Sequence, residues 1–256
     1  MNIKKLFVAS VKALDLGSAL AVRLTKLTGK SKVPIHPKHL LTQKPWFTKY
    51  LKSSDIVLDL GCGNGQNSIK ASKIVKKVVG LELSGELLNL AKESFGFKRI
   101  KNIKFEMGNL EERLKYKDQA FDKVIFLDVL EHLIKRGQAL SEAKRVLKNG
   151  GLLFLGVPNS ETSWKKLQRS VGINSFSDPD HKIEFREGAI NNLLNKEGFE
   201  IIKFGYGKYD IPARGLVDII GGFSLYLYRI IDNLRASKAQ ENPKEASGFE
   251  IVAKKI

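Results

Sequence analysis

The fold is decided by the stretch Val57-Leu58-Asp59-Leu60-Gly61-Cys62-Gly63-Asn64-Gly65, which is followed by Gly80-Leu81-Glu82-Leu83-Ser84. In the first stretch an apolar strand runs into three glycines. Glycine lets the chain turn sharply, and it lets backbone N–H groups approach a ligand at the start of the next helix, which we expect over residues 66–75. The pattern therefore predicts a polar ligand at the end of a buried strand.

The glycine spacing argues against a dinucleotide site. A dinucleotide fingerprint reads G-x-G-x-x-G, with a third glycine that packs the helix on the strand. Here Gly61, Gly63 and Gly65 form G-x-G-x-G. Asp59 before the loop and Glu82 at the end of the second strand suit a ligand that carries a cationic amino acid and a ribose diol.

This pattern resembles that of the class I S-adenosylmethionine-dependent methyltransferases. The resemblance implies that the glycine loop holds the methionine part of S-adenosylmethionine and that Glu82 binds both ribose hydroxyls. A polar residue after the third strand would face the adenine, and Asn109 stands there, where Asp is more usual. The cofactor contacts expected from the resemblance are Asp59, Gly61, Cys62, Gly63, Asn64, Gly65, Glu82, Leu83, Asn109, Leu110 and Asp128.

Short apolar runs alternate with helical patterns, which is typical of a parallel sheet with helices on both faces. We expect strands at 56–60, 78–82, 103–107, 123–127, 151–157, 199–206 and 249–254, and helices at 85–95, 135–147 and 186–196. Asn149-Gly150-Gly151 should supply the turn before the fifth strand. The expected fold is a Rossmann-like, seven-stranded, mostly parallel sheet, in which the resemblance makes the last strand antiparallel.

The domain organisation expected from these patterns has four parts. Residues 1–52 form a basic amphipathic N-terminal helical region, and residues 53–208 form the methyltransferase core. Residues 209–247 form an amphipathic helical insertion with a polar linker at 236–247. Residues 248–256 return the chain to the core as its last strand.

The end of the fourth strand carries Asp128, Glu131 and His132, whose i, i+3, i+4 spacing would place them on one side of a helical turn. With His181 they could bind a magnesium, manganese or zinc ion. Similar constellations occur in metal-dependent O-methyltransferases, including small-RNA 2′-O-methyltransferases, where the ion polarises hydroxyl groups. Asp at the first position is shorter by one methylene.

Two other interpretations of these residues stay open. Glu131 and His132 could only orient the segment at the cleft. Alternatively, His132 or His181 could act without metal as a general base, because an imidazole titrates near neutrality and can accept a hydroxyl proton. The catalytic candidates are thus His132, His181 and Glu131.

Composition indicates a globular enzyme, with 256 residues of which 43% are hydrophobic. Cys62, the single cysteine, excludes an internal disulfide and is expected to be a small buried residue rather than a nucleophile. Residues 1–21 resemble a signal peptide, but Lys12 and Asp15 interrupt the apolar run. We therefore expect a cytoplasmic protein without a membrane span.

The net charge is +17, and more than half of the excess lies in residues 1–52, where Asp15 is the only acid. Such a segment can lie on anionic lipid when its apolar side chains share one helical face. The apolar side chains that share this face are Ile3, Leu6, Phe7, Val11 and Leu14.

A second apolar stripe precedes the last strand, and Gly221-Gly222 should kink its helix. Either helical segment could contact lipid or simply pack on the core. Residues Asp218, Arg229, Asp232 and Asn233 are expected to lie away from this stripe. The stripe consists of Leu216, Ile219, Ile220, Phe223, Leu227, Ile230, Ile231 and Leu234.

The favoured function is S-adenosylmethionine-dependent O-methylation of a small hydrophobic or membrane-associated acceptor. A quinone precursor, a lipid or a lipid-linked sugar would fit, and the resemblance points to the ubiquinone-type branch. The alternative is a metal-assisted RNA 2′-O-methyltransferase whose basic surface binds phosphates, although the basic region offers few aromatic rings for base stacking. A cofactor-binding scaffold without activity is the third hypothesis.

Overall fold

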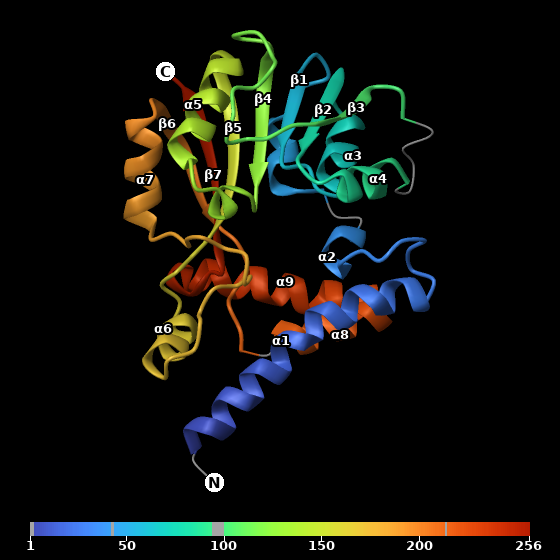
Figure 1. Cartoon of the computed structure of the whole chain (residues 1–256), viewed down its shortest axis with the longest axis vertical. Coiled ribbons are helices and arrows are strands. Elements are labelled where there is room, and N and C mark those ends of the chain that lie inside the picture. The colour runs from blue at the N-terminus through green and yellow to red at the C-terminus, as the bar shows by residue number, and fades with distance from the viewer. Residues whose placement is uncertain (1–2, 42–43, 94–99, 213) are drawn as a thin grey trace. The chain divides into compact units, whose positions relative to one another are not determined.

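The structure, a computed structural model, describes residues 3–41, 44–93, 100–212 and 214–256, without the side chains of residues 3 and 11–16 (Figure 1). Its elements fall into two compact units. The helical unit comprises Met1–Gln43, Ser160–Phe176 and Tyr206–Ser247, and the sheet unit comprises Lys44–Asn159, Ser177–Gly205 and Gly248–Ile256. The four-part division expected from the sequence stays a prediction.

The sheet unit is built on seven strands in the order β3-β2-β1-β4-β5-β7-β6. Strands β1 to β5 pair in parallel where they adjoin, and β7 runs antiparallel to β5. This arrangement confirms the predicted fold class. The strands are β1 Ile56–Leu60, β2 Lys77–Glu82, β3 Ile103–Met107, β4 Phe121–Leu127, β5 Leu147–Pro158, β6 Phe199–Tyr206 and β7 Gly248–Lys255.

Helices α3 Gln66–Ser72 and α4 Gly85–Glu93 connect β1 to β2 and β2 to β3, whereas α5 Arg136–Val146 connects β4 to β5. Because parallel crossovers are right-handed, the reversal of direction at β1 and β4 places α5 on the opposite face from α3 and α4. Helix α7 Glu187–Lys196 precedes β6. In such a sheet, the carboxyl ends of β1 and β4 form the switch point at which ligands bind.

The core of the sheet unit centres on Phe154 of β5, which is fully buried. Its ring stacks on Phe47 with centroids 5.8 Å apart, and Trp46 meets it edge-on at 6.0 Å. Both residues belong to the short helix η1 Trp46–Tyr50. The end of the predicted N-terminal region is therefore part of the sheet unit, because its aromatic side chains complete the core.

One expectation about the α5–β5 connection is wrong. Helix α5 ends at Val146, close to the predicted boundary, but Asn149-Gly150-Gly151 lies inside β5 instead of forming the turn before it. The register shifts here, since Phe121 pairs with Leu147 and Lys123 with Leu152. The extra residues bulge out of the ladder, and Gly150 takes the left-handed conformation that such an irregularity needs (φ 72°). The predicted end of α4 at residues 94–95 lies outside the described residues.

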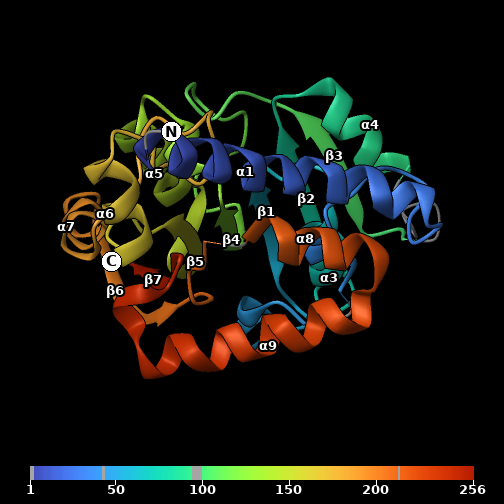
Figure 2. The same cartoon turned by 90° about the horizontal axis from the view of Figure 1, so that it is seen from below.

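The helical unit consists of α1 Ile3–Leu27, α2 Pro37–Leu40, α6 Ser163–Ser170, α8 Arg214–Phe223, α9 Leu225–Glu241 and the short η4 Pro243–Glu245. Helices α1 and α8 lie side by side (Figures 1 and 2). They approach closely because glycines line the seam: a Cβ atom on Gly17 would lie 2.6 Å from the Gly215 carbonyl oxygen, and one on Gly222 would lie 2.7 Å from the Leu24 Cβ.

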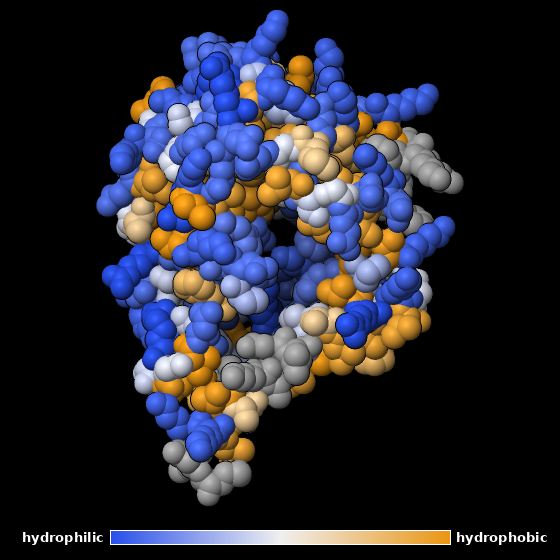
Figure 3. Space-filling model, viewed as in Figure 1, coloured by the Kyte–Doolittle hydropathy of each residue, from blue (hydrophilic) through white to orange (hydrophobic). Residues whose placement is uncertain are grey.

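The sequence left open whether the apolar stripe of α8 and α9 packs on the core or faces outward, and part of it faces outward. Asp218 and Asp232 are buried, with 1% and 2% of their surfaces exposed, whereas half or more of Leu216, Phe223 and Leu234 is exposed. Asp218 accepts a hydrogen bond from the Ser18 hydroxyl (2.5 Å), and Asp232 pairs with Lys208. Figure 3 shows hydrophobic residues along the lower right edge, where Figure 1 places α1 and α8.

Two further expectations about the helical segments change, and a third lies partly outside the described residues. The helix continues through Gly221-Gly222, and the break falls at Ser224, whose hydroxyl accepts a hydrogen bond from the Leu227 N–H and begins α9. The polar segment at 236–241 is the end of α9 rather than a linker. On the predicted face of α1, the side chains of Ile3, Val11 and Leu14 lie outside the described residues, while Leu6 is exposed. In the described part of the chain, no helix combines the length and apolar character needed to cross a bilayer.

The glycine seam predicts a stability effect. Gly17→Ala should lower the free energy of unfolding by about 1–3 kcal/mol, because the added methyl group meets backbone that cannot move away. Gly188→Ala on α7 is the control, since a Cβ there meets nothing within 4 Å and alanine favours a helix. Urea denaturation would measure both, and an unchanged midpoint for Gly17→Ala would contradict the close packing.

Candidate active site

The glycine loop follows β1 at the switch point, and Gly61, Gly63 and Gly65 all have positive φ angles of 68°, 52° and 76°. Gly61 and Gly65 are also sterically required, because a Cβ atom would lie 2.5 Å from Val129 and from Phe105 respectively. At Gly63 a Cβ atom would meet nothing within 4 Å. The backbone at Gly63 therefore has open space beside it, as a loop that receives a ligand needs.

Glu82 fixes this loop to the end of β2. One carboxylate oxygen accepts a hydrogen bond from the Gly63 N–H (2.9 Å), and the other accepts from the N–H groups of Leu83 and Ser84 (2.9 Å each). An ionised carboxylate has about four acceptor positions, so capacity remains for a ligand hydroxyl. The predicted ribose partner thus also holds the loop in place.

Asp59 lies on β1 directly below the loop and is almost fully buried. Its carboxylate accepts a hydrogen bond from the Ser68 hydroxyl on α3 (2.5 Å). Burial raises the pKa of Asp59 to about 7; the Ser68 hydrogen bond opposes this rise, and the neighbouring Glu82 charge adds to it. A cationic ligand group nearby would favour the ionised form of Asp59.

Cys62 and Asn64 complete the loop. Cys62 is buried, and burial raises the pKa of its thiol, so the group stays protonated near neutral pH. The prediction that it packs as a small residue agrees with this environment. Asn64 is half-buried.

The segment after β3 has a different arrangement from the one expected for an adenine contact. The Asn109 side chain donates a hydrogen bond to Glu112 (2.9 Å) and accepts one from the Glu111 N–H (2.9 Å), so it stabilises its own turn. Leu110 is buried. The role of both residues in cofactor binding stays a prediction.

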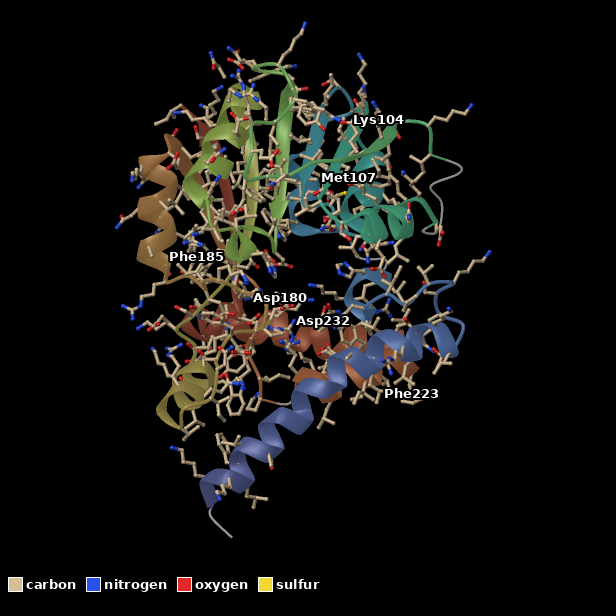
Figure 4. All side chains as sticks on the ribbon, in the orientation of Figure 1. Lys104, Met107, Asp180, Phe185, Phe223 and Asp232 are labelled. Carbon is tan, nitrogen blue, oxygen red and sulfur yellow. The ribbon has the colours of Figure 1, made fainter. Side chains whose placement is uncertain are left out.

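Met107 is a candidate that the sequence argument missed. It ends β3 opposite Glu82, and its side chain is 61% exposed, while Leu83, the residue after β2, is 64% exposed (Figure 4). Met107 and Leu83 are thus exposed apolar side chains at neighbouring strand ends, beside Glu82. Such side chains are suited to pack against the two faces of an adenine ring. The sequence could have indicated Met107, because it is the last residue of its predicted strand, as Glu82 is the last residue of β2.

On the other side of the switch point, the predicted helical turn after β4 does not form. Asp128 has a left-handed backbone (φ 56°) and an exposed side chain, and the short helix η3 starts only at Leu130. Glu131 and His132 lie in η3 and Asp128 lies outside it. The expectation that all three share one helical face is therefore wrong.

The loop that carries His181 is joined to η3 by backbone hydrogen bonds. The Lys182 N–H donates to the Glu131 carbonyl (2.8 Å), and the Phe185 N–H donates to the Pro158 carbonyl at the end of β5 (3.0 Å). Figure 4 labels Asp180 and Phe185, which belong to this loop. These bonds explain why residues distant in sequence meet at one place.

His132 and His181 contact each other edge to face, with ring centroids 4.6 Å apart. His181 Nδ1 lies 3.0 Å from Glu184 Oε1, and its Nε2 lies 3.8 Å from Glu131 Oε1. Glu131, Glu184 and the His181 side chain are buried. Burial and the neighbouring His181 lower the pKa of His132, so its imidazole is neutral at pH 7. We call these four residues the histidine cluster.

The predicted metal site is only partly assembled. Among the described residues, Glu131, His132 and His181 each offer a ligand atom within 4.8 Å of the others, and Asp128 is not part of this group. Two atoms that each lie about 2 Å from one zinc ion are at most about 4 Å apart. The described ligand atoms lie within 4.8 Å of one another, so they would have to move closer together to bind zinc. Metal binding stays a prediction.

Comparison with known proteins identifies the family. Residues 51–198 match the family described as a methyltransferase domain. The chain belongs to this family, and with the fold above these residues form a class I S-adenosylmethionine-dependent methyltransferase domain.

Individual relatives agree with this assignment. A probable S-adenosylmethionine-dependent methyltransferase from Mycolicibacterium smegmatis is 28% identical over 163 residues, which cover 62% of this chain and 59% of that protein. The rat mitochondrial ubiquinone biosynthesis O-methyltransferase is 30% identical over 105 residues, which cover 40% of this chain and 30% of that protein. The chain thus spans about three fifths of the first of these curated relatives and less of the second.

Among solved structures, an S-adenosylmethionine-dependent methyltransferase from Methanosarcina mazei has the same fold. Its TM-score is 0.58 at 24% identity, and the match covers 84% of this chain and 99% of that one. Family membership implies S-adenosylmethionine as the cofactor. The residues fit it: the open backbone at Gly63, the remaining acceptor capacity of Glu82 and the buried Asp59 match its amino acid and ribose groups.

Replacement of Glu82 should weaken cofactor binding. Glu82→Gln introduces an amide in place of the carboxylate that faces three N–H groups, so we expect the affinity for S-adenosylmethionine to fall about tenfold to a hundredfold. Isothermal titration calorimetry would measure it. Glu86→Gln, an exposed acid in the first turn of α4, is the control and should bind normally. Equal affinity of both variants would contradict the role of Glu82.

The raised pKa of Asp59 predicts a pH dependence. If the cationic methionine group binds the ionised form, the affinity for S-adenosylmethionine should fall as the pH drops through 7, approaching about tenfold per pH unit well below it. Calorimetry between pH 5.5 and 8.5 would measure this slope. Asp59→Asn should bind more weakly at pH 8 and lose the slope near pH 7. A wild-type affinity independent of pH would contradict the assignment.

Proposed function

We propose that this protein is an S-adenosylmethionine-dependent O-methyltransferase that acts on a hydroxyl of a small apolar acceptor: a quinone precursor, a lipid or a lipid-linked sugar. The observation that carries the proposal is the neutral His132 imidazole beside β4, in edge contact with His181. A neutral imidazole at a ligand-binding strand end is suited to accept the proton of a hydroxyl nucleophile. The proposed location is the cytoplasm, at or near a membrane surface.

The cofactor, when bound, supplies a methyl group on a sulfonium sulfur, which leaves as a neutral thioether as the acceptor oxygen bonds to the methyl carbon. The chain's own contribution begins with Glu82 and Asp59, which orient the ribose and amino groups. Two hydrogen bonds hold the glycine loop in one conformation. The Gly63 N–H donates to Glu82, and the Ser68 hydroxyl of α3 donates to Asp59 of β1. In-line transfer depends mainly on such positioning.

The histidine cluster handles the acceptor proton in this proposal. His132 takes the proton from the hydroxyl as the oxygen attacks. The resulting imidazolium lies against His181, whose two ring nitrogens face Glu184 and Glu131. Buried carboxylates beside His181 offset the positive charge that the cluster gains.

The acceptor class rests on two supports. The rat relative is by its printed name an O-methyltransferase of ubiquinone biosynthesis, and its match to this chain covers 40% of the chain. Independently, exposed apolar side chains and lysines of the helical unit suit an acceptor that resides in or near lipid.

A second candidate function, metal-assisted methylation of an RNA 2′-hydroxyl, is favoured by one observation. Glu131, His132 and His181 gather potential ligand atoms within 4.8 Å. A divalent ion held there would polarise the hydroxyl in place of a base. Treatment with EDTA separates the two functions, since base catalysis should survive it and metal-assisted transfer should not.

The base assignment predicts separate effects on binding and turnover. His132→Ala should bind S-adenosylmethionine normally and lose about a hundredfold in kcat. The wild-type kcat should rise with pH below 6.5 and be level at pH 7 and above, because the lowered pKa leaves His132 neutral there. Lys182→Ala, next to His181, is the matched control. Normal turnover in His132→Ala would overturn the assignment.

The acceptor class can be tested with a matched pair of catechols and an RNA. Transfer of the tritiated methyl group would be measured to a catechol that carries a short prenyl chain, to the same catechol without it, and to a single-stranded RNA oligonucleotide. The proposal expects the lowest KM for the prenylated catechol. Methylation of the RNA alone, abolished by EDTA, would favour the second function instead.

A further inference from the structure

Helices α1, α8 and α9 expose a set of large apolar side chains, which we call the leucine face. Their exposed fractions range from 39% at Ile230 to 79% at Leu27. Soluble proteins seldom expose so many large apolar residues on adjoining elements unless the surface binds something. The leucine face consists of Leu20, Leu27, Leu216, Phe223, Leu227, Ile230 and Leu234.

The packing of α1 on α8 places their exposed leucines on the same side. The two helices run parallel, because Gly17 meets Gly215 and Leu24 meets Gly222. The hydrogen bond from Ser18 to Asp218 lies on one side of this seam. By helical periodicity, Leu20 and Leu27 of α1 and Leu216 and Phe223 of α8 project from the other side.

The exposed end of α8 is also visible in the side-chain view. Figure 4 shows Phe223 at the outer side of α8, with its side chain beyond the ribbons. Helix α9 starts directly after it, at Leu225, and exposes Leu227, Ile230 and Leu234 at successive turns. Helix α9, which packs on α8, therefore adds three exposed apolar side chains to those of α8.

Two acids of these helices, Asp218 of α8 and Asp232 of α9, are turned inward. Asp218 is 99% buried, and although burial opposes its ionisation, His36 and Ser18 hold its pKa below the usual range. His36 Nε2 lies 3.3 Å from Asp218, and the Tyr228 hydroxyl lies 3.5 Å from it. Burying a charged carboxylate while leucines face outward is unfavourable in water alone. The arrangement is favourable where the outer face meets an apolar phase that would exclude carboxylates.

Basic residues border the leucine face. Arg23 and Lys26 are exposed on the outer part of α1, and Lys32 is exposed in the segment that follows it. Arg229 is exposed on α9 and lies over the Tyr226 ring, 5.5 Å from its centroid. Lysine and arginine beside apolar side chains match the anionic headgroups and the acyl chains of a bilayer surface.

We propose that the leucine face is a docking surface for an anionic lipid bilayer, into which its apolar side chains insert while the bordering cations bind headgroups. A second copy of the chain is a poorer occupant, because face-to-face pairing would bring the two basic borders together. The proposal stands on the helical unit alone and does not depend on which acceptor the enzyme methylates.

Vesicle flotation with the full chain tests the proposal. The vesicles would contain phosphatidylcholine alone or with 30% phosphatidylglycerol. A double variant, Leu216→Gln with Leu227→Gln, removes two side chains that are each 50% exposed on the leucine face. The control, Leu167→Gln with Ile202→Gln, removes two that are 46% and 48% exposed elsewhere. Circular dichroism and calorimetry with S-adenosylmethionine would confirm that each variant folds and binds the cofactor.

The proposal expects the wild type and the control to float with the anionic vesicles, and the Leu216/Leu227 variant to bind them about tenfold more weakly. Binding should persist in part at high salt, because the apolar contribution is not screened. Equal flotation of both double variants, or no flotation of the wild type, would overturn it. So would a wild-type dimer in sedimentation that becomes a monomer in the Leu216/Leu227 variant, since a second copy would then cover the face. The cofactor measurements report separately on the proposed enzyme activity.

Discussion

The cofactor side of the site depends on one carboxylate. Glu82 accepts three backbone hydrogen bonds, one from the glycine loop after β1 and two from the turn after β2. Because these two strands are neighbours in the sheet, the bonds set the positions of both strand ends at once. An apolar residue in place of Glu82 would leave these N–H groups to water and release the loop. The same carboxylate also raises the pKa of Asp59.

Much of this region could be predicted from the sequence, because short-range chemistry determines it. The glycines need left-handed angles, the strand is apolar and the acid follows at a fixed strand end. The histidine cluster was less accessible: the sequence predicted Glu131, His132 and His181, but neither Glu184 nor the start of η3 after Asp128. Backbone hydrogen bonds from Lys182 and Phe185 bring His181 to His132, and such contacts leave no local pattern. Met107 was missed because an apolar residue at a strand end usually indicates core.

In the helical unit, the apolar periodicity of the sequence did not predict which side of each helix is buried. The apolar stripe of α8 and α9 was found, but periodicity alone does not say which side faces the protein. Glycine contacts decide this, because Gly17, Gly215, Gly221 and Gly222 allow close packing on the side that also carries Asp218. The paired acids then face inward and the leucines face outward. The exposed leucines belong to the surface for which we propose lipid binding.

The most direct test of the account is a crystal structure of the full chain with S-adenosylhomocysteine. The account predicts that both ribose hydroxyls lie within hydrogen-bond distance of Glu82, that the amino group faces Asp59 and that the sulfur points toward His132. A ribose bound away from Glu82 would contradict it, if the hydrogen bond from the Gly63 N–H to Glu82 is intact in that crystal structure.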